Sequence, residues 1–455
     1  MHVHPLQPAR RLPPAGRIYT CDTTGRHTRR RQAAVWLTQA VWFGLPWLSR
    51  DGAPALRIDL AARRFHLFGS VFWPQDLVFL AALMAIAVAA LFLVAIVGGR
   101  VWCAWGCPHA IYGEIFQWIE RRIEGGRSAR MRRDAAPWNL ARGWRKLAKH
   151  AAWLSLSAWI GITLAAYFTP MRELLPALAA GAPGPTESFL AAAYGGLAYV
   201  NAGWMRTRFC RHVCAWARFQ SAMADSRTPA VAYDAARGEP RAPFRRQTAT
   251  REAGDCVDCT LCVQACPSGI DIRDGDQYDC IDCGACIDAC DTVMGKLGRP
   301  RGLIRRAAPR AVHGPAWMRP RVIVLGSALL VASAAWWLAL AARAPLRLSV
   351  VADRPPQGAE APPGTAVYRV RIVHAGERAR RVALRLDGAP AGLSLRGDTE
   401  LDLAPHAERV VVVRVSGWEN LPEDAPARPV LAAWPLDGRD EAGERATVAI
   451  ARPPR

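Results

Sequence analysis

The stretch from residue 256 to 290 begins Cys256-Val-Asp-Cys-Thr-Leu-Cys-Val-Gln-Ala-Cys266-Pro267 and ends Cys280-Ile-Asp-Cys-Gly-Ala-Cys-Ile-Asp-Ala-Cys290. The spacing C-x2-C-x2-C-x3-C occurs twice with an offset of 24 residues, so this stretch is an internal repeat. Three cysteines at this spacing bind one face of a cubane, and the fourth binds the neighbouring cluster. We therefore expect two [4Fe–4S] clusters, one on Cys256, Cys259, Cys262 and Cys290, the other on Cys280, Cys283, Cys286 and Cys266.

The alternative interpretation of the repeat is a pair of four-cysteine zinc sites. Zinc sites usually separate two C-x2-C pairs by a longer loop, so the motif favours iron–sulfur clusters. Acidic residues beside the ligands should lower the cluster potential, although an exposed acidic loop explains them equally well. A nearby arginine group is suited to docking an acidic electron donor or contacting a membrane surface. The acids are Asp255, Asp258, Asp279 and Asp282, and the arginines are Arg299, Arg301, Arg305 and Arg306.

Charge is distributed unevenly along the 455 residues. Lys and Arg number 59 against 38 acidic residues, a formal charge of +21, yet residues 347–455 carry 16 basic and 15 acidic residues. The excess therefore lies in the part that also holds the long apolar runs, where basic residues report membrane topology. A nucleic-acid partner is not indicated. Thiolates that hold clusters point to the cytoplasmic side of a membrane.

Apolar runs predict a helical transmembrane bundle of about five spans. Residues 76–98 give the clearest span, and the eleven basic residues of 100–150 place that segment inside. We expect residues 51–75 to form an external loop or a surface-lying segment. The predicted spans are 33–48, 76–98, 151–168, 189–205 and 322–342.

These spans predict a multi-domain membrane protein. A basic cytoplasmic tail (1–33), without a cleavable signal peptide, precedes a transmembrane region (34–206) with four spans and the basic cytoplasmic loop 100–150. A cytoplasmic ferredoxin-like 2[4Fe–4S] domain (207–320) and a fifth span (321–343) follow. Residues 344–455 then form a periplasmic domain.

That last domain is rich in β-branched residues separated by Gly, Pro and Asp turns, as in Tyr368–Val373, Arg381–Leu386 and Arg409–Val415. The pattern predicts a seven-strand, immunoglobulin-like antiparallel β-sandwich. It carries no metal-ligand cluster, so we expect an interaction or spacer domain.

Four further thiols form two C-x3-C pairs, Cys103 with Cys107 and Cys210 with Cys214, at the inner ends of the second and fourth predicted spans. In a helix each pair lies on one face, one turn apart. Soft thiolates favour Cu(I), and a nearby histidine also binds Cu(II), so the pairs suggest a transient copper site. The alternative is that these cysteines are small apolar residues. His109 and His212 are weaker candidates.

Several motifs together resemble the FixG/CcoG/RdxA family of cytochrome c oxidase accessory proteins. The matching stretches are Phe72-Trp-Pro-Gln-Asp76, Gly99-Arg-Val-Trp-Cys103, Cys107-Pro108, Glu114-Ile-Phe-Gln-Trp-Ile-Glu-Arg121, Ala217-Arg-Phe-Gln-Ser-Ala-Met223, Arg237-Gly-Glu-Pro240, Cys286-Ile-Asp-Ala-Cys-Asp291 and Arg299-Pro-Arg-Gly-Leu-Ile304.

The resemblance implies an inner-membrane protein with two [4Fe–4S] clusters that supports assembly of cbb3-type oxidase, with oxidase assembly factors or copper chaperones as partners. It implies reduction of Cu(II) to Cu(I), with copper as the substrate ion. The eight repeat cysteines match the family's cluster ligands, and Cys103, Cys107, Cys210 and Cys214 match its membrane-proximal cysteines. Ala215 and His109 depart from the usual proline and glutamine, which leaves the local geometry at both pairs open.

We expect a one-electron relay in which a cytoplasmic donor reduces the clusters and the electron passes to Cu(II) at the helix ends. A second hypothesis is a quinol-linked conduit to a periplasmic reductase, although the chain lacks the C-x-x-C-H haem motif. A third is a non-enzymatic copper chaperone or assembly scaffold with structural clusters.

Overall fold

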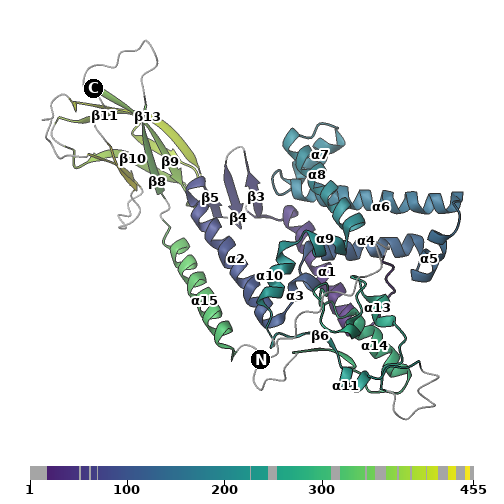
Figure 1. Cartoon of the computed structure of the whole chain (residues 1–455). Coiled ribbons are helices and arrows are strands. Elements are labelled where there is room, and N and C mark those ends of the chain that lie inside the picture. Colours follow the sequence, from purple (N-terminus) through teal and green to yellow (C-terminus); the bar gives the residue numbers. More distant parts are fainter. Residues whose placement is uncertain are drawn as a thin grey trace. The chain divides into compact units, whose positions relative to one another are not determined.

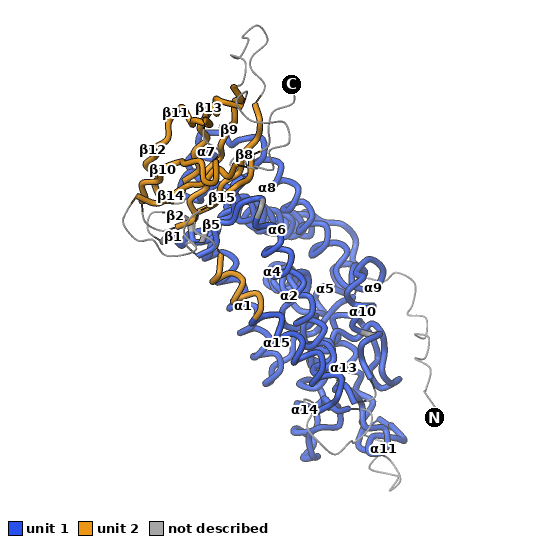
Figure 2. Tube along the Cα trace, turned by 90° about the vertical axis from the view of Figure 1, so that its left-hand side faces the viewer, with its two compact units in different colours: residues 1–334 blue, residues 335–455 orange. Residues whose placement is uncertain are grey.

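A computed structural model describes most of the chain, in two compact units, residues 1–334 and 335–455 (Figures 1 and 2). The described residues are 18–50, 53–60, 63–68, 70–225, 227–243, 254–308, 318–343, 346–353, 365–376, 379–389, 392–405, 407–418, 429–436 and 446–450.

The first unit is mainly helical. Its helices are α1 (Arg26–Gly44), α2 (Leu77–Gly98), α3 (Val101–Trp105), α4 (Pro108–Glu124), α5 (Arg127–Ala135), α6 (Leu140–Ala165), α7 (Met171–Ala179), α8 (Pro185–Ala198), α9 (Thr207–His212), α10 (Ala215–Met223), α11 (Ala235–Gly238), α13 (Leu261–Ala265) and α14 (Ala285–Lys296), with short helices η1 (Leu45–Trp47), η2 (Pro74–Asp76) and η4 (Ile272–Asp274) and the π-helix η3 (Tyr199–Met205).

Helices α6 and α8 pack closely because small residues line their contact. A Cβ added at Gly161 would lie 2.1 Å from the Ala191 carbonyl oxygen, and one at Gly195 would lie 2.8 Å from that of Ser157. The backbones therefore approach each other at positions that only glycine allows, as in tightly packed membrane helices.

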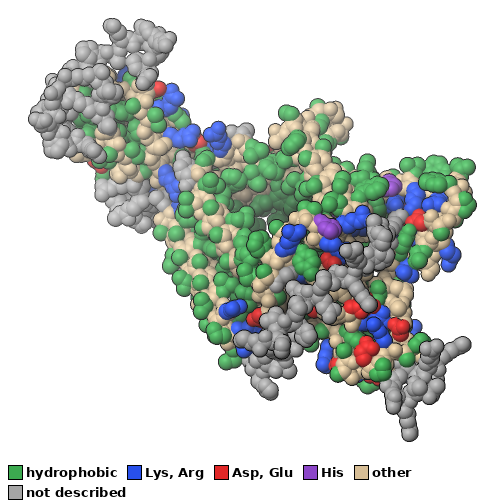
Figure 3. Space-filling model, viewed as in Figure 1, with side chains coloured by type: hydrophobic (Ala, Val, Ile, Leu, Met, Phe, Trp, Pro, Cys, Tyr) green, Lys and Arg blue, Asp and Glu red, His purple; other side chains and the backbone are tan. Residues whose placement is uncertain are grey.

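Two described helices, α2 and α15 (Pro320–Ala341), are long and apolar enough to cross a membrane. At most 6% of the most apolar window of either is buried, and Figure 3 shows hydrophobic side chains over α2. Neither is therefore the core helix of a soluble protein, and the pair indicates a membrane protein. The other three predicted spans fall on α1, α6 and α8 with η3. These helices begin with basic residues or are short, so five spans remain a prediction.

Residues 53–72 differ from the predicted loop or surface-lying segment. The strands β3 (Leu56–Asp59), β4 (Arg64–Leu67) and β5 (Ser70–Phe72) form an antiparallel sheet, preceded by the small pair β1 (Ser49–Arg50) and β2 (Ala53–Pro54). The physical reason is the alternation of polar and apolar residues, which suits a half-buried strand.

The predicted basic loop 100–150 is also ordered, as α3, α4, α5 and the first turns of α6. Helix α4 begins with proline at its first position, and Asn139 caps α6 by accepting a hydrogen bond from the Arg142 N–H at 2.8 Å. This segment is a helical arm that carries Cys103 and Cys107 at its start.

The second unit contains two four-stranded antiparallel sheets, ordered β12–β10–β14–β15 and β11–β13–β9–β8. Val370 and Ile372 from one sheet share a core with Val382 and Leu384 from the other. The described residues thus form a two-sheet sandwich with eight strands, one more than expected; the immunoglobulin-like topology stays a prediction. The strands are β8 (Leu346–Asp353), β9 (Thr365–His374), β10 (Arg380–Asp387), β11 (Ser394–Gly397), β12 (Glu400–Leu403), β13 (Glu408–Ser416), β14 (Val430–Pro435) and β15 (Ala446–Ala449).

Candidate metal centre

The first half of the cysteine repeat meets the last cysteine of the second half. Cys256 and Cys259 lie in the loop before α13, Cys262 lies within α13, and Cys290 lies on α14. All four line one cavity, closed by apolar side chains such as Met294 and Leu303. The structure therefore brings Cys290 to the first three cysteines, as the crossed spacing predicts.

The second set gathers around Cys283. Burial is the main cause that raises the pKa of Cys280, Cys283 and Cys286, and the nearby charges of the other thiolates add to the rise at Cys280 and Cys286. Cys266 interacts electrostatically with Cys283, Cys280 and Cys286, so it lies with the other half of the repeat. Cys290 and Cys266 thus each lie near the first three cysteines of the other half, as the crossed ligand assignment requires.

The backbone conformation is the same in both copies of the cysteine repeat. Asp258 and Asp282, the residues two after the first cysteine of each copy, both have positive φ, 49° and 59°. Thr260 and Gly284, two positions further on, do so again, with φ of 57° and 74°. Each copy therefore has left-handed backbone at the same two positions before its helix. This conformation lets the three cysteines face one volume.

The donor sets suit an iron–sulfur cluster. Each is made of four thiols, with no histidine or carboxylate. Four cysteines also hold structural zinc, but the C-x2-C-x2-C-x3-C spacing is that of cluster ligands. The four thiols around the first cavity therefore fit a [4Fe–4S] cubane.

Each of the four acidic residues that the sequence singled out beside the ligands pairs with an arginine. This neutralises much of the negative charge that was expected to lower the cluster potential. The pairs are Asp255–Arg237 (2.5 Å), Asp258–Arg273 (2.6 Å), Asp279–Arg211 (2.9 Å) and Asp282–Arg306 (2.7 Å).

Two of the arginines expected to dock a donor are also engaged within the chain. Arg306 pairs with Asp282 as above, and the exposed Arg305 lies 3.2 Å from Asp234.

The four membrane-proximal thiols line a separate, larger cavity of about 240 Å³. Cys103 lies in α3 and Cys210 in α9, whereas Cys107 and Cys214 directly precede α4 and α10. The fold thus joins two segments more than 100 residues apart in the chain.

The two pairs share one local geometry. The Cys107 N–H donates to the Trp102 carbonyl at 2.8 Å, and the Cys214 N–H donates to that of Phe209 at 2.9 Å, so both bonds reach back five residues. An unbroken helix, the condition for each pair to lie on one helix face, is absent at both pairs, because one helix ends before the second cysteine and a new one begins after it. Pro108 and Ala215 occupy the same first helical position, so the missing proline leaves the geometry intact.

Burial keeps the Cys103 and Cys210 thiols protonated in the absence of a metal. It raises the pKa of Cys103 to about 12 and that of Cys210 to about 11, and the neighbouring thiols add to the rise. The Cys103 thiol donates to Gln220 Oε1 at 2.8 Å. A soft metal would have to displace these protons to bind.

The two histidines behave differently. His109 lines the cavity, but its Nε2 lies 2.8 Å from the Arg206 carbonyl oxygen and its ring packs on Phe209. His212 is exposed and does not line the cavity.

Direct contacts join the four-thiol cavity to the second half of the repeat. Arg211, next to Cys210, makes a two-bond ion pair with Asp279 at 2.9 Å for each bond. Arg100, three residues before Cys103, donates to the Cys280 carbonyl at 2.7 Å. Cys283 itself lines the four-thiol cavity. The two groups of thiols are therefore neighbours held by charged contacts.

The N-terminal segment contributes residues that the sequence did not single out. It was predicted as a tail without a role, yet Cys21 lines the four-thiol cavity and donates its N–H to the Gln264 carbonyl at 2.9 Å. Asp288 on α14 accepts from the Thr28 N–H and Oγ1, both at 2.7 Å, and so caps α1 from another helix. No local pattern signals these contacts. Residues 1–17 of the predicted tail lie outside the described residues.

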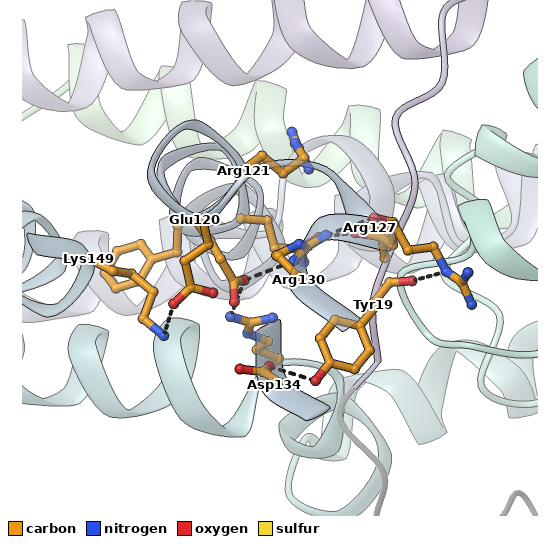
Figure 4. A network of polar contacts seen from close by, with 12 residues as sticks. Tyr19, Glu120, Arg121, Arg127, Arg130, Asp134 and Lys149 are labelled. Carbon is orange, nitrogen blue, oxygen red and sulfur yellow. Dashed lines mark hydrogen bonds and ion pairs between the residues drawn. The ribbon is translucent and has the colours of Figure 1, made fainter. Parts of the chain in front are cut away.

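A buried polar network fixes this segment against the helical arm (Figure 4). Tyr19 donates to Asp134 at 2.7 Å, and Arg130 donates to the Thr20 carbonyl at 2.8 Å. Glu120, fully buried, pairs with Arg206 at 2.7 Å and with Arg130 at 3.4 Å. Removing one member would leave an uncompensated buried charge, so the network holds a specific arrangement.

Fold and site together define a ferredoxin-type iron–sulfur membrane protein. Sequence profiles agree: one described as a 4Fe-4S dicluster domain matches residues 205–308, and one described as a 4Fe-4S binding domain matches residues 80–125. The chain is 36% identical over 418 residues to nitrogen fixation protein FixG of Rhizobium meliloti (strain 1021), covering 82% of this chain and 80% of that protein. It is 37% identical to protein RdxA of Cereibacter sphaeroides, covering 84% and 86%. The chain therefore belongs to the FixG/RdxA family.

A solved FixG-related protein from Vibrio parahaemolyticus is also similar, with 14% identity, coverage of 20% of this chain and 79% of that one, and a TM-score of 0.16.

Proposed function

We propose that this protein is a cupric reductase that supplies Cu(I) for assembly of the copper centre of cbb3-type cytochrome c oxidase. The observation that carries the proposal is the cavity lined by Cys103, Cys107, Cys210 and Cys214 together with Cys283 of the repeat. Thiols suited to copper and a thiol suited to an iron–sulfur cluster thus line the same cavity.

In this proposal Cys256, Cys259, Cys262 and Cys290 hold one cluster, and Cys280, Cys283, Cys286 and Cys266 hold the other. Each bound cluster supplies one electron at a time. The protein's part is to bury most of these thiols and to pair the nearby carboxylates with arginines, which tunes the potential.

The four membrane-proximal thiols receive the copper ion. Binding requires the thiols to lose their protons and to move closer together, since they do not form a preassembled site for one ion. Cu(I) is softer than Cu(II), so the reduced ion matches the thiolates better and is retained until transfer. The contacts of Arg211 with Asp279 and of Arg100 with the Cys280 carbonyl keep donor and acceptor regions together.

The proposal places the chain in the bacterial inner membrane with about five spans. The N-terminus and clusters face the cytoplasm, where an electron donor reduces them, and an immunoglobulin-like sandwich faces the periplasm. Oxidase assembly factors or copper chaperones are the partners that receive Cu(I). The cytoplasmic orientation is supported by the strongly basic segment 100–150, which follows the apolar helix α2.

A deletion strain tests the biological role. Without the chain, cbb3 oxidase activity at low copper should fall, and added copper should restore part of it. The wild-type chain and Cys21→Ser should complement, because Cys21 lines the same cavity but lies outside both pairs. Cys103→Ser/Cys107→Ser should not complement. Full complementation by that double variant, or no response to copper, would reject the proposal.

A further inference from the structure

A second cavity, of about 430 Å³, lies between α6 and the turn from η3 into α9. On α6 its residues follow the i, i+3, i+4, i+7 spacing of a single helix face. Its described lining contains four Lys and Arg side chains and no Asp or Glu. The main lining residues are Lys146, Lys149, His150, Trp153, Trp204, Arg206 and Arg208.

The carboxylates that balance these cations lie outside the lining. Glu124 Oε1 is 3.1 Å from Lys146 Nζ and 3.0 Å from Lys149 Nζ, and Glu120 forms an ion pair with Arg206. Four cations thus line the cavity, while the carboxylates that pair with three of them lie outside its described lining. This arrangement favours an anion in the cavity.

Aromatic rings hold the cations in place at this site. The Trp153 ring lies 4.8 Å from Lys149 Nζ and 5.6 Å from Arg206 Cζ, both within cation–π range. His150 stacks on Trp204, with ring centroids 5.8 Å apart. The walls are thus preorganised, which lowers the entropic cost of binding.

Exposed apolar side chains lie in the cavity lining and on the adjacent strip of α6. Trp204 lines it and is 62% exposed, while Leu147 and Leu154, on the next strip of α6, are 59% and 58% exposed. A cationic pocket beside an apolar rim matches an amphipathic ligand with an anionic head.

We infer that this cavity binds the phosphate group of an anionic phospholipid, with the acyl chains on the Leu147 and Leu154 strip. Lys and Arg are the usual partners of phosphate oxygens, and basic pockets between membrane helices bind lipid headgroups. Inorganic phosphate offers the same chemistry to the cations but nothing to the apolar rim.

Native mass spectrometry of the delipidated full-length protein, titrated separately with phosphatidylglycerol, phosphatidylcholine and inorganic phosphate, tests the inference. Phosphatidylglycerol should bind saturably and at least tenfold more tightly than the other two. Equal binding of the two lipids would overturn the site, and inorganic phosphate binding as tightly as phosphatidylglycerol would overturn its assignment to a lipid.

Variants locate the binding. Lys146→Gln/Arg208→Gln should weaken phosphatidylglycerol binding roughly fivefold for each charge removed. Arg145→Gln removes one positive charge from an exposed position of α6 that does not line this cavity, and it should have no effect. Iron content of each variant checks folding, and the single Arg208→Gln variant replaces the double one if the latter misfolds. Equal affinities for Arg208→Gln and Arg145→Gln would overturn the inference.

Discussion

The cysteine repeat and the four-thiol cavity use the same side chain in different ways. The repeat draws eight thiols from 35 consecutive residues, and the first four-thiol set lines a small cavity closed by apolar side chains. The cavity draws four thiols from two distant helix junctions around about 240 Å³ of space. Close, local packing suits a cofactor that stays, whereas thiols around an open volume suit an ion that enters and leaves. The spacing of cysteines in the sequence therefore defines the first site, whereas tertiary packing defines the second.

The largest expected effect is at the crossed ligand. Cys290→Ser should lose the cluster that it shares with Cys256, so the anaerobically purified protein should contain about four fewer iron atoms. Iron and acid-labile sulfide analysis measures this, and Cys21→Ser is the control. A Cys290→Ser protein that keeps all of its iron would show that the halves do not exchange their fourth cysteine.

The next effect separates the two sites. Cys103→Ser/Cys107→Ser should retain the iron of the wild type but bind Cu(I) at least tenfold more weakly, because two soft ligands are lost. Competition with a chromophoric Cu(I) chelator measures the affinity. Unchanged affinity would remove copper from the four-thiol cavity.

The contact between the sites can be broken alone. Arg211→Gln removes the ion pair with Asp279 and should slow copper-dependent cluster oxidation about tenfold after rapid mixing, since small displacements of reacting groups have large kinetic effects. Arg237→Gln removes the equivalent pair with Asp255 beside the other half of the repeat and should leave the rate near that of the wild type. Equal rates for both variants would contradict a path through the second half.

The smallest effect concerns the N-terminal segment. Asp288→Ala removes the side chain that caps α1, at a cost of about 1–2 kcal/mol, and should speed trypsin cleavage at Arg29–Arg31. Asp291→Ala is the matched control, because Asp291 accepts instead from the Gly302 N–H at 2.8 Å. Identical cleavage of the two variants would show that the cap does not hold the segment.

Local signals explain which features could be predicted from the sequence. The cysteine repeat could be predicted from the sequence because its spacing is short and its local backbone conformation recurs in both copies. The sheet β3–β5 was missed although Leu56 and Ile58 alternate with Arg57 and Asp59, a period-2 pattern. Pro108 is likewise a local signal, because it marks the start of a new helix after Cys107.

Contacts between residues far apart in the chain have no local sequence signal that would predict them. The docking of Tyr19 and Cys21 depends on partners about 100 or more residues away, and a single sequence does not show such pairings. The same holds for the meeting of the two C-x3-C pairs in one cavity, which the fold of the whole first unit produces.

The most direct measurement is anaerobic titration of the reduced protein with Cu(II), followed by cluster absorbance and a Cu(I)-specific chelator. We expect about two Cu(I) ions per chain, with loss of one electron from each cluster. Copper that binds while the clusters stay reduced would contradict it.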